Sequence, residues 1–237
     1  GMAEQVEALL RELDLQGSVA WIEGDNLIPR LDTLRGAGQH LTNLETGIPL
    51  HASGNQPLTA NAYLGAWGIK EALDQGADIV ICPRVTDASI VMGPAAWKFN
   101  WQRDDYDALA GALVAGHLIE CGPSVAGGNY AFFEEVPSFH NMGYPIAELD
   151  RRGHFTLSKN PGTGGLISMG TVTAQLLYEI NAPAYLNPDV IAHFDTVKLE
   201  QVGPDRVHVS GCRGSSPPST HKVCINTHGG YRSVVEM

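Results

Sequence analysis

The chain has 237 residues, of which 43% are hydrophobic and 17% are charged, and its formal net charge is −11. This balance supplies enough apolar surface to offset the entropy of ordering the chain, which excludes a disordered protein. The negative charge makes attraction to nucleic acid or to an anionic membrane unfavourable, so we expect neither as a partner. No stretch reaches the roughly 18 apolar residues of a membrane span, and the start of the chain lacks the layout of a signal peptide. Four widely spaced cysteines without a Cys-x-x-Cys pair fit reduced thiols, and we expect a cytoplasmic protein.

Helical and extended patterns alternate in the first part of the chain. Residues 3–13 place apolar side chains at the spacing of an amphipathic helix, and residues 18–22 predict a strand. A second pair follows, with a predicted helix over 59–75 and a short apolar strand over 78–82. This alternation predicts an α/β fold with a layered, largely parallel sheet covered by helices.

Antiparallel hairpins are predicted after about residue 144. One hairpin spans residues 146–159 with a turn at 150–153, and a second spans 197–210 with a turn at 203–205. Between them a glycine-rich loop leads into a helix that we expect to end near residue 180.

The change of pattern divides the chain into two predicted parts. Residues 1–143 form an α/β body, in which 36–58 lack any period and predict a long loop, and 104–121 predict a further helix. Residues 144–237 form a mixed, β-rich part with the glycine-rich loop and its helix.

Charged side chains follow both predicted strands of the body. Arg84, Thr86 and Asp87 come after the second strand, and Glu23 and Asp25 come after the first. Ligands of open α/β sheets bind beyond the carboxyl ends of the strands, so neighbouring strands would bring these groups to one crevice. The alternative is that Thr86 or Asp87 caps a helix that begins near residue 88.

A second group lies on the predicted helix 104–121. His117 and Glu120 are three residues apart and therefore share one side of that helix, which is its apolar side. Such a pair serves either as a general acid and base or as two ligands of a divalent metal. The alternative is a core histidine that a carboxylate orients. We interpret the adjacent Cys121 as a small core residue and not as a nucleophile.

The third group is the glycine-rich loop. Lys159 precedes Gly162, Thr163, Gly164 and Gly165, and a helix is expected to follow. Glycines let backbone N–H groups approach an anion closely, and a helix N-terminus favours negative charge, so we predict an anion site here. The alternative is a turn between strand and helix that needs glycine for steric reasons only.

Several long strings resemble the acyclic terpene utilisation protein family. They run through nearly the whole chain, from about residue 1 to residue 231, and include GADIVICPRVTDASIVMGP, LVAGHLIECGPSVAGGNY, GYPIAEL, KNPGTGGLISMGTVTAQLLYEI, PDVIAHF and EQVGPDRVHVSG. The resemblance implies that members are longer, with an N-terminal segment ending in Asn-Ala-Gly-Gly-x-Asn-Pro, so that this chain corresponds to the central part of the domain. We therefore expect the isolated chain to be weakly active and to self-associate as a homo-oligomer, because a sheet that lacks strands exposes edges and apolar surface.

The resemblance also implies a role in the degradation of citronellol, geraniol and related acyclic terpenoids, whose intermediates are branched acyl-CoA thioesters. The expected reaction is a carbon–carbon lyase or hydratase step with a small-molecule acyl-CoA as substrate. Asp87 or His117 would be the base, Arg84 or a divalent metal would stabilise the thioester enolate, and the loop at 162–165 would hold a phosphate of coenzyme A.

Two other classes remain open. A metal-assisted hydrolase would use His117 and Glu120 with Glu23 or Asp25 as ligands of a divalent metal. A binding or scaffold subunit of a terpene-degrading assembly would use none of these residues for chemistry.

Overall fold

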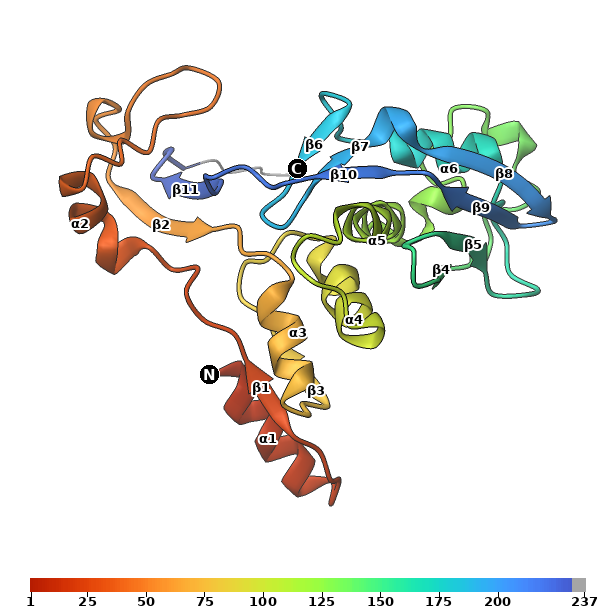
Figure 1. Cartoon of the computed structure of the whole chain (residues 1–237), viewed down its shortest axis with the longest axis horizontal. Helices are drawn as coiled ribbons and strands as arrows, with labels where there is room; N and C mark the ends of the chain where they lie inside the picture. The colour runs from red at the N-terminus through yellow and green to blue at the C-terminus, as the bar shows by residue number, and fades with distance from the viewer. Residues whose placement is uncertain (232–237) are drawn as a thin grey trace, which may run out of the picture.

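A computed structural model describes residues 1–231 as a mixture of helices and short strands (Figure 1). Within that part of the chain the helices are α1 (Met2–Glu12), α2 (Leu31–Gly36), α3 (Trp67–Asp74), α4 (Ser89–Phe99), α5 (Tyr106–Ile119) and α6 (Met169–Leu176). The strands are β1 (Val19–Trp21), β2 (Pro57–Ala62), β3 (Ile79–Ile81), β4 (Pro145–Leu149), β5 (Phe155–Lys159), β6 (Ala184–Leu186), β7 (Ile191–His193), β8 (Lys198–Gly203), β9 (Arg206–Ser210), β10 (Arg213–Ser215) and β11 (Val223–Thr227). Residues 232–237, which belong to the predicted second part, lie outside the described residues.

Helix α5 is the centre of the hydrophobic core. Every residue from Leu109 to Leu118 is buried, because α4, α6 and the strands β4, β7 and β10 surround this helix. A Cβ atom on Gly111 would lie 2.1 Å from the carbonyl oxygen of Gly153, so only glycine allows the β4–β5 turn to pack this closely. The core contains residues from both sides of the predicted boundary at 143/144.

The prediction of a largely parallel sheet is wrong. Among the strands of residues 1–231, only β1 and β3 pair in parallel, and the other three sheets of this part of the chain, with orders β4-β5-β9-β8, β10-β7-β6 and β11-β2, are antiparallel. A parallel pair needs a long crossover, which the chain provides between β1 and β3, whereas β4–β5 and β8–β9 are joined by short turns that permit only antiparallel pairing. The helix–strand alternation of the first 82 residues therefore produced one parallel pair and not a layered sheet.

The predicted helix over 59–75 is wrong in its first half. Strand β2 occupies residues 57–62 and pairs with β11, and α3 begins only at Trp67. Ala60 and Ala62 are buried while Asn61 between them is less so, which is the period of two that a strand requires. The sequence partner of β2 lies about 160 residues away, so local spacing could not identify the strand.

Most of the other expected elements are confirmed. The two hairpins are β4–β5 and β8–β9, and the helix expected over 104–121 is α5. The helix expected to end near residue 180 is α6, which stops at Leu176. Residues 36–58 are irregular over most of their length, with the short helical turn η2 (Leu50–Ala52).

The N-terminal elements α1, β1 and β3 project from the rest of the molecule (Figure 1). None of the residues of α1, β1 or β3 is buried, and the large side chains of Leu9, Leu13, Leu15 and Trp21 are exposed. We call these three elements the N-terminal arm. Over residues 1–231, no helix combines the length and the apolar composition that crossing a membrane demands.

Candidate functional site

The loop after β3 and the end of α5 meet because of one glycine. A Cβ atom on Gly116 would lie 2.6 Å from the Cα atom of Ala88, so glycine lets the start of α4 rest directly on α5. This contact brings Asp87, which precedes Ala88, to the same end of α5 as His117 and Glu120. Two of the groups predicted separately from the sequence are therefore neighbours.

His117 is buried and is held from both sides. Its Nε2 atom lies 3.0 Å from the carbonyl oxygen of Gln175, and its Nδ1 atom lies 3.6 Å from Oε1 of Glu120. A carbonyl oxygen only accepts hydrogen bonds, so Nε2 carries a proton and Nδ1 faces the carboxylate. The aromatic rings of Phe194 and Tyr185 pack beside the imidazole, with ring centroids at 5.5 and 6.1 Å. This arrangement fits an acid–base pair in which the histidine is fixed and the carboxylate reaches outward.

Tyr185 on β6 completes this group and was not predicted from the sequence. Burial raises the pKa of its phenol above the ordinary value, and the nearby charges of Glu120, Asp87 and Glu179 raise it further. The phenol therefore stays protonated at neutral pH and is available as a hydrogen-bond donor. We call Asp87, His117, Glu120 and Tyr185 the acid–base cluster.

Two buried amides border the acid–base cluster. Gln175 is fully buried, and its Oε1 atom accepts a hydrogen bond from Asn129, but its Nε2 atom has no partner among residues 1–231. Nδ2 of the buried Asn187 also lacks a hydrogen-bond partner within the described part of the chain. Buried amide donors are normally paired with an acceptor. Within residues 1–231 these two donors are not, so each has a hydrogen that an acceptor atom of a ligand would satisfy.

Cys121 does not have the predicted role of a core residue, because it is exposed. Partial burial of the thiol and the charge of Glu120 raise its pKa above the ordinary value. A raised pKa disfavours the thiolate, which is the nucleophilic form. Cys121 thus borders the cluster as a neutral thiol.

Arg84 and Asp87 form an ion pair with each other. Nη1 of Arg84 lies 3.5 Å from Oδ1 of Asp87, and both side chains are largely exposed. The alternative that Asp87 or Thr86 caps α4 is wrong, because the N-cap is Ala88 without a side-chain hydrogen bond, while Thr86 bonds to the Ser89 hydroxyl. Arg84 and Asp87 therefore face outward, whereas the Thr86 hydroxyl bonds to the buried Ser89.

The two carboxylates after β1 are placed differently. Asp25 accepts hydrogen bonds from the Asn61 side chain at 2.7 Å and from the Arg84 backbone N–H at 3.3 Å. Glu23 is exposed and accepts a hydrogen bond from Trp21 instead. Within residues 1–231, no three His, Cys, Asp or Glu side chains gather closely enough to hold a metal ion, so the four predicted ligands do not form one site.

The glycine-rich loop uses its donors internally. The buried Lys159 ammonium binds Asp205 at 3.1 Å and the Thr163 carbonyl at 2.9 Å. The N–H groups of Gly164 and Gly165 donate to the carbonyl oxygens of Asn141 and Ser138. The helix does not follow directly, because α6 begins at Met169 with Ser168 as its N-cap. The steric interpretation of this loop is supported, and anion binding by Lys159 and residues 162–165 stays a prediction.

Replacing Gly164 is not a clean test of that prediction. A Cβ atom at Gly164 would lie 2.3 Å from the carbonyl oxygen of His140 and 2.8 Å from that of Ser138. A valine at this position would therefore disturb the loop, because backbone atoms would have to move.

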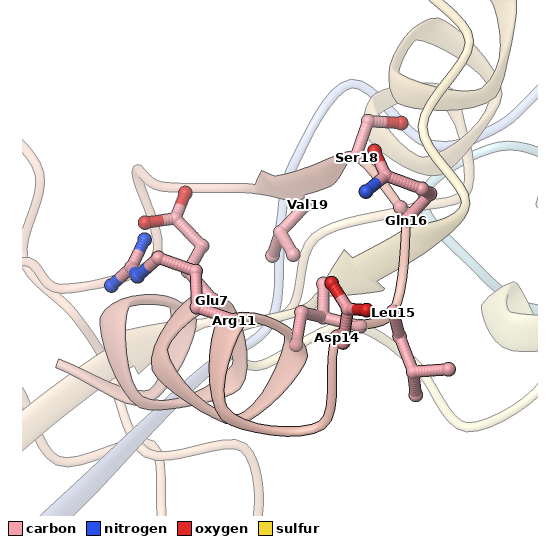
Figure 2. A pocket seen from close by; sticks show the side chains of 9 residues that line it. Glu7, Arg11, Asp14, Leu15, Gln16, Ser18 and Val19 are labelled. Carbon is pink, nitrogen blue, oxygen red and sulfur yellow. The ribbon is translucent and has the colours of Figure 1, made fainter.

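A hollow of about 520 Å³ lies elsewhere, between α1 and β1 (Figure 2). Its rim carries Glu7, Arg11 and Asp14 from α1 and the turn after it, and Ser18 and Val19 from the start of β1. None of the residues of the acid–base cluster lines it. The hollow lies on the N-terminal arm, where no residue is buried. None of its lining residues is therefore a buried acid or base.

The structure thus defines a protein of mixed helices and strands with a buried histidine–carboxylate pair beside a protonated phenol. The family model described as "Acyclic terpene utilisation family protein AtuA" matches residues 1–237, and the chain belongs to this family. Searches of curated proteins and of solved structures found no match.

Sequence reasoning missed Tyr185, Gln175 and Asn187. They lie on β6, on α6 and in the β6–β7 turn, at least 55 residues from Glu120 in the chain. The sequence signal for this region was the Asn-Pro-Asp turn at 187–189. The structure shows that its polar residues are buried, although turns are normally exposed.

Proposed function

We propose that the acid–base cluster catalyses proton transfer on a branched acyl-CoA thioester, in a carbon–carbon lyase or hydratase step of acyclic terpenoid degradation. Membership of the acyclic terpene utilisation family supports the pathway. The observation that carries the chemistry is the buried His117–Glu120 pair, which opens towards Tyr185 and Asp87.

Both reactions pass through a thioester enolate. A lyase step removes the proton of a 3-hydroxyl group, breaks the bond between Cα and Cβ, and leaves the electron pair in the thioester enolate. A hydratase step removes a Cα proton to form the enolate, which then expels water from Cβ. Each needs one group that takes and returns a proton and one donor for the enolate oxygen.

The cluster offers both groups. Glu120 takes the proton, and His117, which is anchored to the Gln175 carbonyl through Nε2, lies beside the carboxylate with its Nδ1 atom 3.6 Å from Oε1. Tyr185 donates its phenolic hydrogen to the enolate oxygen, because its raised pKa keeps it protonated. Arg84 provides a rigid guanidinium for a second oxygen, and Asp87 is an alternative base.

Deuterium exchange tests this proposal without requiring full turnover. The chain is incubated in D₂O with a branched acyl-CoA, and mass spectrometry follows deuterium at Cα. We expect Glu120→Gln to slow the exchange by roughly 100-fold, the usual size of a lost general base. Tyr185→Phe should also slow the exchange, because it removes the hydrogen-bond donor to the enolate oxygen.

Glu45→Gln is the matched control, since Glu45 is exposed and its side chain forms no hydrogen bond or ion pair within residues 1–231. Exchange by the native chain that survives Glu120→Gln would contradict the proposal. Exchange that disappears with a chelator would mean that a divalent metal, and not Tyr185, stabilises the enolate. Absence of any exchange would favour a binding subunit or a metal-assisted hydrolase, because thioester hydrolysis removes no Cα proton. Isotope from H₂¹⁸O in the 3-hydroxyl group would separate hydratase from lyase.

A further inference from the structure

Cationic side chains gather on two aromatic rings near the start of α3. The guanidinium of Arg84 and the ammonium of Lys222 lie 5.4 and 5.2 Å from the centre of the same ring, that of Tyr63. Four residues further on, the guanidinium of Arg103 lies 4.7 Å from the centre of the Trp67 ring. Three of the chain's 15 lysine and arginine side chains thus lie over two rings that are four residues apart in the sequence, although the chain has 26 acidic residues. We call these five residues the cationic–aromatic surface.

Backbone hydrogen bonds hold the parts of this surface in register. The N–H of Tyr63 donates to the carbonyl oxygen of Lys222 at 2.9 Å, which ties the segment before α3 to the segment before β11. The N–H of Leu64 donates to the Arg84 carbonyl, and the N–H of Thr86 returns a bond to Leu64. The rings and the cations come from four segments of the chain. These bonds fix the segments of Tyr63, Arg84 and Lys222 side by side, so little backbone ordering is left there for a ligand to impose.

Two of the cations are available to an anion. Arg103 and Lys222 are exposed, and neither forms an ion pair with a carboxylate of residues 1–231. Arg84 is paired only with the exposed Asp87. Burial raises the pKa of the Asp189 carboxyl beneath this surface. The hydrogen bond from the Ala66 N–H and the charges of Arg103 and His221 act in the opposite direction.

We propose that the cationic–aromatic surface binds the adenosine phosphate end of coenzyme A. An aromatic ring stacks on a base, and neighbouring guanidinium and ammonium groups bind phosphate oxygens, which is how proteins hold single nucleotides. The inference rests on the proposed acyl-CoA substrate and places its phosphate contacts here instead of at the glycine-rich loop, whose Lys159 is occupied by Asp205. Arg84 connects this surface to the acid–base cluster through its ion pair with Asp87.

Adenosine 3′,5′-bisphosphate is the probe, because it contains the nucleotide of coenzyme A without its reactive thiol. Isothermal titration at low salt with the full chain should detect binding. Lys222→Gln and Arg103→Gln should each weaken that binding about fivefold to tenfold, and Tyr63→Leu should weaken it by a similar factor. The matched control is Lys198→Gln, which removes an exposed positive charge from β8.

Coenzyme A, dephospho-coenzyme A, ATP and inorganic phosphate are titrated in parallel to separate a specific site from general anion binding. Weaker binding in the three variants with an unchanged control supports the proposal, as does a preference for coenzyme A over its dephospho form. Absence of binding, equal weakening by Lys198→Gln, or a loss confined to a folded Lys159→Met variant would overturn it. Titration of Glu120→Gln keeps the two proposals distinct, because that variant should bind the probe normally while its deuterium exchange fails.

Discussion

The hydrophobic core around α5 and the N-terminal arm use the same kinds of residues with opposite results. In α5 every residue from Leu109 to Leu118 is buried, whereas the arm contains no buried residue. Leu9 and Leu13 of α1 are 53% and 62% exposed although they lie at helical spacing. The difference is the number of elements that cover each helix, since α5 is enclosed by helices and strands and α1 rests on β1 alone. An amphipathic pattern therefore stabilises a fold only where other elements cover its apolar face.

The largest contrast between the two regions is expected in thiol reactivity. Burial raises the pKa of Cys212 in the core to about 12. Burial also raises the pKa of Cys82, which follows β3, but the shift is smaller. An increase from 9.0 to about 12 reduces the thiolate fraction roughly 1000-fold, so Cys212 should react with a disulfide reagent at pH 8 at least that much more slowly than an ordinary thiol. Peptide mapping after timed labelling measures both rates.

The same pKa predicts a direction for stability. The folded state holds the Cys212 proton more tightly than the unfolded state, so this contribution is intact below about pH 9 and is lost as the pH rises towards 12. Equal labelling rates for Cys212 and Cys82 in the folded chain would mean that the core opens as readily as the arm.

A pair of leucine truncations comes next. Leu113→Ala in α5 should lower the free energy of unfolding by about 2–5 kcal/mol, because a fully buried leucine leaves a cavity. Leu9→Ala in α1 should change it by about 0.5 kcal/mol or less, because the side chain is already in contact with solvent. Urea unfolding followed by circular dichroism gives both values, and similar values for the two variants would contradict the contrast.

Substituting alanine for glycine should change stability less than the leucine truncations do. The cause here is overpacking and not a cavity. Gly111→Ala should destabilise by about 1–3 kcal/mol, because its Cβ atom meets the Gly153 carbonyl. Gly36→Ala at the end of α2 has open space around it and should be neutral or slightly stabilising. Thermal unfolding of both variants tests the prediction, and a neutral Gly111→Ala would show that the β4–β5 turn can move away.

The smallest effect on stability is expected at the surface of the arm. We propose that its exposed apolar side chains cause the chain to self-associate, and the double substitution of Leu9 and Leu13 by Glu should shift sedimentation towards the monomer. Stability should change by about 0.5 kcal/mol or less, since neither residue is buried. If the association state stays the same in the doubly substituted chain, another surface mediates the contact.

The sequence by itself determined those parts whose signals are local. The period of α5, the turn residues of the two hairpins, and the His117–Glu120 spacing all act within a few residues, and all are present as predicted. Family membership was also readable, because long strings need no knowledge of the fold.

Only the tertiary structure decided which distant segments meet. Strand β2 needs β11 as its partner, Tyr185 joins Glu120 across 65 residues, and Lys222 reaches the ring of Tyr63 from near the other end of the chain. These pairings depend on close packing at glycines such as Gly116, where the absence of a side chain has no meaning until the facing element is known. Long-range contacts are the sum of many weak packing terms over the whole chain, so no window of the sequence contains the information that selects them.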